Sequence, residues 1–305
     1  MSSVQPIQMD AVTTDRISDP LLLEKSISLS ILRLDKIHPV ISGNKWFKLK
    51  YYLADAKTKG YETILTFGGP YSNHIAATAC AANILDFRSI GLIRGEEPAT
   101  WSHTLQEARS NGMLLHFLNR AVYDDYKRSP FHEALVKQFG DCYIIPEGGI
   151  GELGLNGARE ILELVDISKY SHISAAIGTG TTIAGLLEKT AIDQELTGFS
   201  SMKNNNSLLS EIEVLINRSL PGRFRLVHDY HFGGYARYNN ELLEWMNWFY
   251  DTQRIPLDFV YTGKMLYGIF DLVSKDYFPP DARILAVHSG GLQGNRSLPE
   301  GLLQF

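Results

Sequence analysis

Lys45 is the residue whose type and setting first point to chemistry. It follows Ser-Gly-Asn at residues 42–44, which predicts a turn, and a helical pattern begins directly after it. A lysine amine can bond covalently to a carbonyl compound when a short rigid loop holds it and part of its population is neutral. The alternative is a surface charge at a helix start, and exposed surface charges are also the prediction for Lys48 and Lys50.

A phosphate-sized ligand is the prediction for the stretch IGTGTTIAG at residues 177–185. An apolar strand runs into Gly178, Thr179, Gly180, Thr181 and Thr182, and a helical pattern follows. Glycines let the backbone approach a ligand, and a helix N-terminus offers unpaired N–H groups to an anion. The stretch lacks the G-K-[ST] of a Walker loop and the third glycine of a dinucleotide-binding fingerprint. A plain strand–helix turn with threonine caps is the alternative.

Two further glycine loops follow predicted strands. In TFGGPYSNHIAA, two glycines end a strand, and Ser72 and Asn73 begin a helix either as caps or as ligand contacts. His74 alone is more typical of a histidine satisfied within a helix. In VHSGGLQGN, at residues 287–295, the loop after the last strand could close a pocket against a flat ligand.

These loops sit within an alternation of short apolar strands and helices, which predicts parallel βαβ units with right-handed crossovers. Ligands of such sheets gather at the carboxyl ends of the strands. The predicted strands lie around residues 63–66, 89–93, 113–118, 142–145, 172–177 and 283–288, and the predicted helices include residues 102–112, 155–165, 239–252 and 263–276.

Composition bounds the class of protein. The 305 residues suit one large α/β unit or two modest domains, and the formal net charge of −5 argues against a nucleic-acid or anionic-membrane partner. We see neither a signal-peptide pattern at the N-terminus nor an apolar stretch of about 18 residues that could span a membrane. Cys80 and Cys142 lack C-x-x-C or metal-ligand spacing, which predicts two reduced thiols in a cytoplasmic protein without a metal site.

The motifs taken together and in order resemble one family. They are a lysine after S-G-N followed by x-x-K-L, then G-G-x-x-S-N-H, T-G-T-T, Y-T-G-K and H-S-G-G. The set is similar to that of the pyridoxal-phosphate enzymes of the tryptophan-synthase-β-like fold (fold type II), in the branch of 1-aminocyclopropane-1-carboxylate (ACC) deaminase and D-cysteine desulfhydrase. The resemblance runs from about Lys36 to Gly291.

This resemblance implies an architecture. The fold would be α/β, with two domains whose parallel-type twisted sheets are flanked by helices and with pyridoxal 5′-phosphate in the cleft between the domains. Residues 48–142 would form the small α/β domain, and residues 1–47 and 143–305 would form the large cofactor-binding domain. The resemblance also implies a homodimer.

The resemblance carries roles onto matching residues. Lys45 would hold the cofactor as a Schiff base and shuttle the substrate Cα proton, with Ser72 as a carboxylate contact or nearby acid/base and Tyr261 beside the substrate. Asn73 would hydrogen-bond the cofactor's phenolic oxygen, and Thr262 or Ser289 would meet its pyridine nitrogen. The phosphate would bind Gly178, Thr179, Gly180, Thr181 and Thr182, and the substrate would contact Tyr71, Ser72, Asn73 and His74.

Departures from the family pattern bear on the reaction. In ACC deaminases a glutamate stands where this chain has Thr262, and a carboxylate there keeps the pyridine nitrogen protonated and the ring strongly electron-withdrawing. A hydroxyl supplies no counter-charge, which favours β-elimination of a good leaving group over cyclopropane ring opening. Pro70 and Tyr71 replace an isoleucine and a glutamine, and the Tyr230–Ala236 stretch is atypical, so the substrate wall is predicted to be remodelled.

The sequence thus predicts a pyridoxal-phosphate-dependent enzyme acting on a small amino acid. The expected reaction is β-elimination like that of D-cysteine desulfhydrase, which gives a 2-oxo acid and ammonia. Three alternatives stay open: an ACC deaminase, a non-catalytic cofactor-binding protein, and a phosphate-ligand enzyme in which Lys45 acts only through its charge. The sequence indicates neither which amino acid is the substrate nor which enantiomer.

Overall fold

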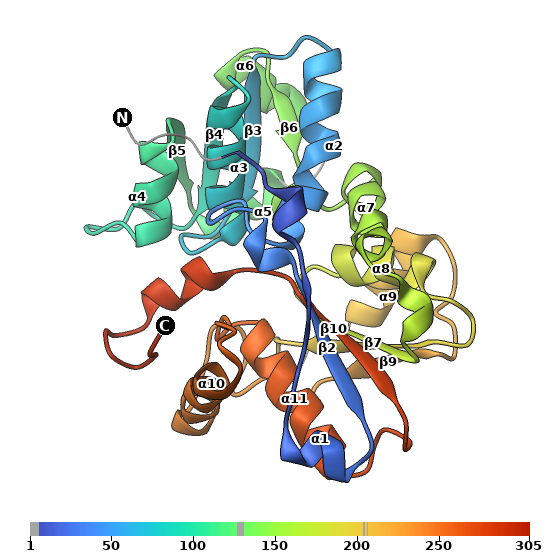
Figure 1. Ribbon diagram of the computed structural model, residues 1–305. Coiled ribbons are helices and arrows are strands. Elements are labelled where there is room, and N and C mark those ends of the chain that lie inside the picture. Colours follow the sequence, from blue (N-terminus) through green and yellow to red (C-terminus); the bar gives the residue numbers. More distant parts are fainter. Residues whose placement is uncertain (1–5, 127–130, 204, 206) are drawn as a thin grey trace. The chain divides into compact units, whose positions relative to one another are not determined.

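The computed structural model describes residues 6–126, 131–203, 205 and 207–305 (Figure 1). Within these residues the chain forms two compact units, each with its own sheet. Unit 1 contains residues 6–7, 38–41 and 45–157, and unit 2 contains residues 8–37, 42–44 and 158–305, apart from the gaps just named. The described part of the predicted small domain falls within unit 1, as do residues 143–157, because the strand at residues 143–145 pairs with the sheet of unit 1.

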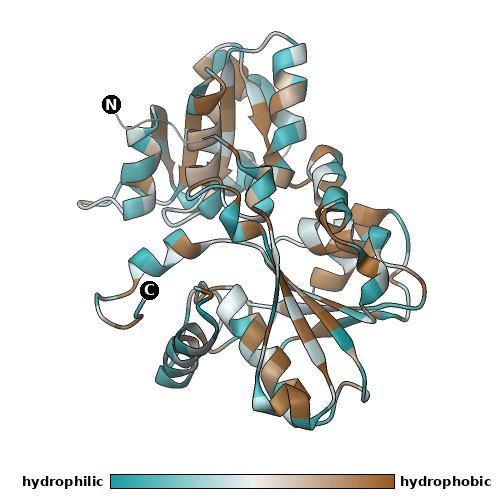
Figure 2. Ribbon diagram, in the orientation of Figure 1, coloured by the Kyte–Doolittle hydropathy of each residue, from teal (hydrophilic) through white to brown (hydrophobic). Residues whose placement is uncertain are grey.

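The sheet of unit 1 has four parallel strands. In spatial order they are β5 (Met113–Leu118), β4 (Arg88–Arg94), β3 (Thr63–Gly68) and β6 (Tyr143–Ile145). Every residue of β3 is buried, as expected for a strand in the middle of a parallel sheet covered on both faces. Figure 2 shows hydrophobic residues concentrated along these strands.

Helices cover both faces of this sheet. Ile64 packs with α2 (Asn44–Thr58) and α3 (Asn73–Ile84), whereas the next residue, Leu65, packs with α5 (Arg120–Tyr126) and α6 (His132–Phe139). Alternate residues of a strand point to opposite faces, which explains the two clusters. α4 (His103–Ser110) packs beside α3. These contacts fix the start of α3 directly after β3, at the carboxyl edge of the sheet.

The sheet of unit 2 has six strands. In spatial order they are β1 (Thr14–Arg16), β2 (Ser28–Arg33), β10 (Arg283–His288), β7 (His172–Ile177), β8 (Glu195–Ser200) and β9 (Phe224–Val227). All neighbours are parallel except β1, which is an antiparallel edge strand. The sequence did not predict β1, because three polar residues carry no periodic signal.

Helices also cover the sheet of unit 2. α1 (Pro20–Glu24), α10 (Asn240–Gln253) and α11 (Thr262–Ser274) bury apolar side chains with β2 and β10 on one face. α8 (Thr181–Lys189) packs on β7 and β8 from the other face, with α9 (Leu208–Ile216) beside it (Figure 1). The helix predicted at 155–165 is α7 (Glu152–Arg159), and it continues as a 3-10 helix over Glu160–Leu164.

Candidate active site

In unit 1, the start of α3 carries the predicted residues Ser72, Asn73 and His74. Ser72 is the N-cap, and its Oγ accepts hydrogen bonds from the backbone N–H groups of His74 at 3.2 Å and Ile75 at 3.4 Å. These bonds occupy the hydroxyl's acceptor sites, so its proton is what Ser72 has left to offer a ligand. The predicted role as an acid or carboxylate donor is compatible with this geometry.

Asn73 presents a buried polar atom that the protein does not satisfy. Its Oδ1 is buried and has no hydrogen-bond partner among the described residues. Buried amide oxygens in folded proteins are nearly always bonded, so this one indicates that a ligand or a water completes the site. Asn73 lies next to Ser72 at the first turn of α3, and the two side chains therefore begin a polar surface at the carboxyl edge of the sheet.

His74 lies deeper than the predicted substrate contact requires. It is 2% exposed, and its Nε2 lies 2.9 Å from Thr66 Oγ1, which donates to the carbonyl oxygen of Ile145. Nε2 must therefore be the donor of that pair, whereas Nδ1 is buried and has no hydrogen-bond partner among the described residues. Burial and the charges of Lys48 and Lys45 hold the pKa of His74 well below its usual value. These contacts argue for a packing role and against direct contact with a substrate.

Lys45 and Lys48 lie near this helix start, as their joint effect on His74 shows. Lys45, the second residue of α2, is partly exposed, whereas Lys48 is only 2% exposed. The prediction of a surface position for Lys48 is wrong because residues three apart share one face of a helix, so Lys48 follows Lys45 inward. Burial, followed by the charge of Lys45, holds the pKa of Lys48 well below its usual value. Lys50 is half-buried, with Nζ over the Phe47 ring.

Tyr71 is the predicted substrate contact that remains open to ligands in unit 1. Its side chain is 57% exposed, and its ring lies 6.0 Å from the His103 ring at the start of α4. The loop before it is tied down, because the Ser102 hydroxyl donates to the carbonyl oxygen of Pro70. The residues that replace the family's isoleucine and glutamine are thus supported by α4.

In unit 2, the predicted phosphate loop connects β7 to α8. Gly180 is the N-cap of α8 with φ +78°, a left-handed conformation that favours glycine. Because this cap has no side chain, the first N–H groups of the helix remain for a ligand. A Cβ at Gly178 would lie 3.2 Å from the Tyr261 hydroxyl, so the loop needs glycine there too. The Thr179 and Thr181 hydroxyls lie 3.5 Å apart, and Thr181 and Thr182 are buried.

Asn44, the residue before Lys45, is hydrogen-bonded to this loop. Its Nδ2 donates to Thr182 Oγ1 at 2.8 Å, and its backbone N–H donates to the Ser289 carbonyl oxygen at 3.2 Å. Asn44 thus joins the T-G-T-T loop to the H-S-G-G loop, and Lys45 is the next residue of the chain. Sequence reasoning used Asn44 only as a turn former, and the spacing of motifs alone could not reveal these two bonds.

Ser289 lies on the same edge of the unit 2 sheet as the phosphate loop. It follows β10, which pairs in parallel with β7, so the carboxyl ends of both strands meet at one edge. Ser289 is partly exposed there, and the preceding His288 is fully buried, with its Nδ1 accepting the Gly290 N–H. The structure therefore brings Ser289 and Gly178–Thr182 to one edge, as the motifs predict.

Thr262 is buried, and Asp258 already accepts a hydrogen bond from its hydroxyl. It is 0% exposed, its hydroxyl donates to Asp258 Oδ2 at 2.6 Å, and its Oγ1 accepts the backbone N–H of Asp258 at 2.9 Å. The Thr262 N–H also donates to Asp258 Oδ2. Thr262 thus closes the first turn of α11 with Asp258, and this geometry argues against its predicted contact with the cofactor.

Tyr261 faces the phosphate loop and has a partner that the sequence did not identify. Its hydroxyl lies against Gly178, and its ring meets the Tyr235 ring edge-on with centroids 6.0 Å apart. Burial, together with the Tyr235 hydroxyl that bonds to it, raises the pKa of Tyr261 well above its usual value. Tyr235 belongs to the Tyr230–Ala236 stretch that the sequence marked only as atypical.

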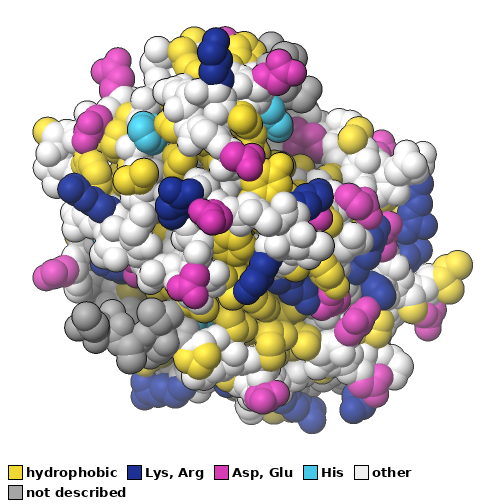
Figure 3. Space-filling view, turned by 90° about the horizontal axis from the view of Figure 1, so that it is seen from above, with side chains coloured by type: hydrophobic (Ala, Val, Ile, Leu, Met, Phe, Trp, Pro, Cys, Tyr) yellow, Lys and Arg dark blue, Asp and Glu magenta, His cyan; other side chains and the backbone are white. Residues whose placement is uncertain are grey.

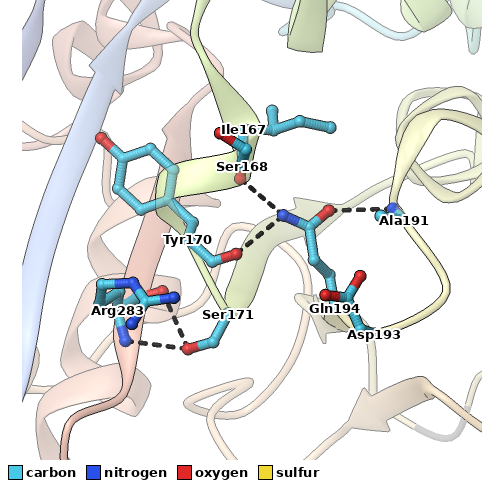
Figure 4. A pocket seen from close by; sticks show the side chains of 8 residues that line it. All are labelled: Ile167, Ser168, Tyr170, Ser171, Ala191, Asp193, Gln194 and Arg283. Carbon is cyan, nitrogen blue, oxygen red and sulfur yellow. Dashed lines mark hydrogen bonds between the residues drawn. The ribbon is translucent and has the colours of Figure 1, made fainter.

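A separate hollow lies at the opposite, amino-terminal edge of the unit 2 sheet (Figure 4). Its polar groups satisfy one another: Gln194 donates through Nε2 to the carbonyl oxygens of Ile167 and Tyr170 and accepts the Ala191 N–H. Ser171 accepts the Arg283 N–H in the same way. These contacts hold the amino-terminal ends of β7, β8 and β10 together.

The two cysteines, the possible metal ligands and the surface charges complete the description of the described residues. Cys80 and Cys142 are free and buried, as predicted, and burial raises the pKa of the Cys80 thiol to about 11. Within the described ranges, no three His, Cys, Asp or Glu side chains come together in a way that could hold a metal ion. No described helix is long and apolar enough to cross a membrane. On the face in Figure 3, acidic and basic side chains are interspersed.

Comparison with known proteins places the chain in a family. A model of the pyridoxal-phosphate dependent enzymes matches residues 23–290. A bifunctional D-cysteine desulfhydrase/ACC deaminase of Arabidopsis thaliana is 30% identical, over 89% of this chain and 74% of that protein. A D-cysteine desulfhydrase of Salmonella newport is 28% identical, over 85% and 86% of the two chains. The crystal structure of an ACC deaminase homologue matches with a TM-score of 0.78 and 26% identity, covering 96% and 94%. The family predicted from the ordered motifs is confirmed, and the chain belongs to the pyridoxal-phosphate dependent enzymes.

Proposed function

We propose that this protein removes ammonia from a small amino acid by β-elimination and releases a 2-oxo acid. One observation carries the proposal: Asn44 is bonded both to the phosphate loop and to the H-S-G-G loop, and Lys45 follows it directly. The nucleophilic lysine that such chemistry requires is therefore fixed, through one peptide bond, to the loops suited to hold the cofactor. Relatives named D-cysteine desulfhydrase support the reaction type.

The residues present fit pyridoxal phosphate. The uncapped N-terminus of α8 with its glycines suits the phosphate, and the buried Asn73 Oδ1 without a hydrogen-bond partner among the described residues supports a ligand at this amide. When bound, the cofactor supplies an aldehyde that bonds to amines and a ring that withdraws electrons from the attached amino acid. In the proposal, Gly178–Thr182 hold the phosphate, and Asn73 hydrogen-bonds the phenolic oxygen.

The proposed work of the side chains is proton transfer and orientation. Lys45 would hold the cofactor aldehyde through its amine and would take the proton from the substrate α-carbon. Ser72, whose hydroxyl proton is not used by the helix cap, donates to the substrate carboxylate. Tyr261 lies against the phosphate loop, and its raised pKa keeps its hydroxyl protonated as a donor beside the substrate. The β-leaving group departs with its electron pair, and hydrolysis then yields the 2-oxo acid and ammonia.

We assign the pyridine nitrogen to Ser289 rather than Thr262. Ser289 is partly exposed at the edge of the sheet that carries the phosphate loop, whereas Thr262 is buried and bonded to Asp258. A serine hydroxyl supplies no counter-charge, so the argument for elimination of a good leaving group is unchanged. His74 is assigned to packing, and Tyr71 remains a proposed substrate contact in addition to Ser72 and Tyr261.

Two substitutions test this assignment. Thr262→Val should lower the free energy of unfolding by about 1–3 kcal/mol, because Asp258 loses a buried hydrogen bond, and should leave the absorbance of the bound cofactor unchanged. Ser289→Ala should change that absorbance and its pH dependence with little effect on stability. Denaturant unfolding and cofactor spectra measure both effects. The reverse pattern, in which only Thr262→Val alters the spectrum, would return the nitrogen to Thr262.

The substrate is best identified with a panel of D- and L-amino acids that includes cysteine, together with ACC. We expect pyruvate from a cysteine enantiomer at a higher kcat/KM than 2-oxobutyrate from ACC. The reverse ranking would make ACC deaminase, to which the bifunctional plant relative also points, the main activity. Bound cofactor whose spectrum no amino acid changes would indicate a non-catalytic cofactor-binding protein.

Two further parts of the proposal concern the assembly and its surroundings. We propose a homodimer and a cytoplasmic location, since the family resemblance implies the first and the two free cysteines are typical of the second. Light scattering of the purified protein measures the oligomeric state. A monomer at micromolar concentration would remove the dimer from the proposal without affecting the assignment of the active site.

A further inference from the structure

Lys264 is a buried lysine to which the proposed reaction gives no role. It is the third residue of α11 and only 2% exposed. Its Nζ donates to the carbonyl oxygens of His231 and Gly234, each at 2.8 Å. Lysine is almost never fully buried unless its charge is paired, and the partners here are backbone carbonyls. Burying a lysine amine is energetically unfavourable, and here the amine bonds to two carbonyl oxygens of one segment.

That segment, residues 230–236, has little structure of its own. It follows β9 as a loop in which Phe232 and Ala236 have φ of +49° and +52°, and Gly233 and Gly234 have φ of +91° and +121°. Left-handed conformations at non-glycine residues are strained and persist only when their surroundings enforce them. Two short internal bonds to His231 help, from Gly233 N–H to Nδ1 and from Gly234 N–H to the carbonyl oxygen. Lys264 adds two bonds from α11, and the Tyr230 hydroxyl donates to Asp271 of the same helix at 2.6 Å.

The loop presents Tyr235 to the active site. Tyr235 directly follows Gly234, whose carbonyl oxygen Lys264 holds, and its ring and hydroxyl contact Tyr261. Tyr261 in turn lies against Gly178 of the phosphate loop. A continuous series of contacts thus runs from Lys264 through the loop to the residue proposed to face the substrate.

We propose that Lys264 is a positioning residue, whose buried amino group fixes the loop 230–236 so that Tyr235 is held against Tyr261. The consequence for turnover rests on the proposed function. The anchoring itself does not, because all of its residues lie within unit 2.

Protonation of Lys264 gives the anchor a specific pH dependence. Burial lowers the pKa of Lys264 to about 8 from the usual 10.5, and the charge of Asp258 opposes this shift. The other titratable groups around it are the His231 ring on the loop and Tyr261 and Tyr267 on α11, the last bonded to Glu241 of α10. Opening the loop returns Lys264 to water and to its usual pKa, so the open state binds more protons between about pH 8 and 10.5. The closed loop is therefore favoured as pH rises through that window, and the neutral amine still has two N–H groups for the two carbonyls.

Hydrogen exchange measured by mass spectrometry tests the anchor in the protein without cofactor. In Lys264→Met, amides of residues 230–237 should exchange about tenfold faster or more, as expected for the loss of hydrogen bonds from a charged donor. Peptides from β7 should be unchanged, which shows that unit 2 stays folded. The matched control is Lys189→Met, at the exposed end of α8 in the same unit, where the lysine pairs with Glu163; it should leave the loop unchanged.

The wild-type protein offers a test that does not depend on a variant folding. After correction for intrinsic exchange, protection of residues 230–237 should increase from about pH 7 to about pH 10. Lys264→Gln, which keeps two N–H donors but does not titrate, should restore part of the protection and lose its pH dependence. Loop protection that is equal in wild type and Lys264→Met, or that falls with pH in wild type, overturns the proposal.

A double-mutant cycle with Tyr235→Phe tests the route to catalysis. If Lys264 acts through Tyr235, the variant carrying both Lys264→Gln and Tyr235→Phe should have a kcat no lower than the worse single variant. Losses that multiply would show that Lys264 does not act through Tyr235 and overturn that route. If the protein shows no turnover at all, the proposed function fails, and the exchange experiments still decide whether the anchor exists.

Discussion

Replacing Lys45 by alanine is expected to abolish the visible absorbance of the bound cofactor and to lower turnover by at least about a thousandfold. The loss is that large because one amine serves both as the covalent attachment and as the base for the substrate α-proton. Asn44 keeps its bonds to Thr182 and Ser289 in this variant, so the loops remain in place and phosphate binding should largely persist. Spectroscopy and product assays on the purified variant, with added cofactor, measure both effects.

The matched control for Lys45 is Lys50→Ala in the same helix. Lys50 is half-buried, with Nζ over the Phe47 and Tyr51 rings. It suits as a control because Lys45 has a predicted role in the site and Lys48 is buried. Its removal should leave the spectrum and kcat near those of the wild type. A Lys45→Ala protein that keeps the absorbance band would move the covalent attachment to another lysine, for which the buried Lys48 is the first candidate.

The second large effect is expected at Gly43, in the turn before Lys45. Gly43 has φ +64°, and a Cβ there would lie 1.8 Å from the Ser289 carbonyl oxygen, which also accepts the Asn44 N–H. Gly43→Ala should therefore push the turn away from Ser289 and lower the free energy of unfolding by about 3 kcal/mol or more. Cofactor affinity should fall with it, because Asn44 loses its bond to Ser289. Denaturant unfolding and cofactor titration measure the two losses.

Gly60→Ala separates the two causes of this effect. Gly60 has a similar φ of +77°, but a Cβ there meets nothing within 4 Å. This variant carries the conformational penalty of a left-handed residue, about 1 kcal/mol, without a clash, and it should bind cofactor normally. Equal losses in Gly43→Ala and Gly60→Ala would show that the close approach to Ser289 does not position Lys45.

Local signals were sufficient for much of the fold and for the order of the site motifs. The strands β3, β4, β5, β7 and β10 are short apolar runs that end in glycine or a turn, and they lie within about two residues of the predicted positions. The loop before α8 was identified because glycine and threonine directly follow a buried strand. Parallel pairing then brings the ends of β7 and β10 to one edge, which is why Gly178–Thr182 and Ser289 meet as the motifs suggested.

The surface position predicted for Lys48 failed because it depends on which face of the helix is buried. Lys48 was taken for a surface charge because lysines usually are, whereas its spacing from Lys45 places it on the buried face of α2. The contact of Thr262 with the cofactor stays a prediction, and the sequence could not show that the Thr262 hydroxyl donates a hydrogen bond to Asp258, four residues earlier. The position of a residue in a motif therefore indicated which part of the fold it belongs to, but not which atoms its side chain contacts.

The residues that were missed act through tertiary contacts. Tyr235 meets Tyr261 across a long sequence separation, and Lys264 bonds to backbone carbonyls that carry no side-chain signature. Asn44 was read as a turn former, although its side chain bonds to Thr182. The glycines at 233 and 234 were the available clue, since left-handed glycines beside aromatic residues often mark a loop that must approach another segment closely.

The covalent position of the cofactor is the most direct test of the central claim. Purified protein would be loaded with pyridoxal phosphate and reduced with borohydride, which makes a lysine attachment permanent, and its peptides would then be analysed by mass spectrometry. The account predicts a phosphopyridoxyl group on Lys45, with Lys48, Lys50 and Lys264 unmodified. Attachment at another lysine, or a protein that takes up no cofactor, would contradict it.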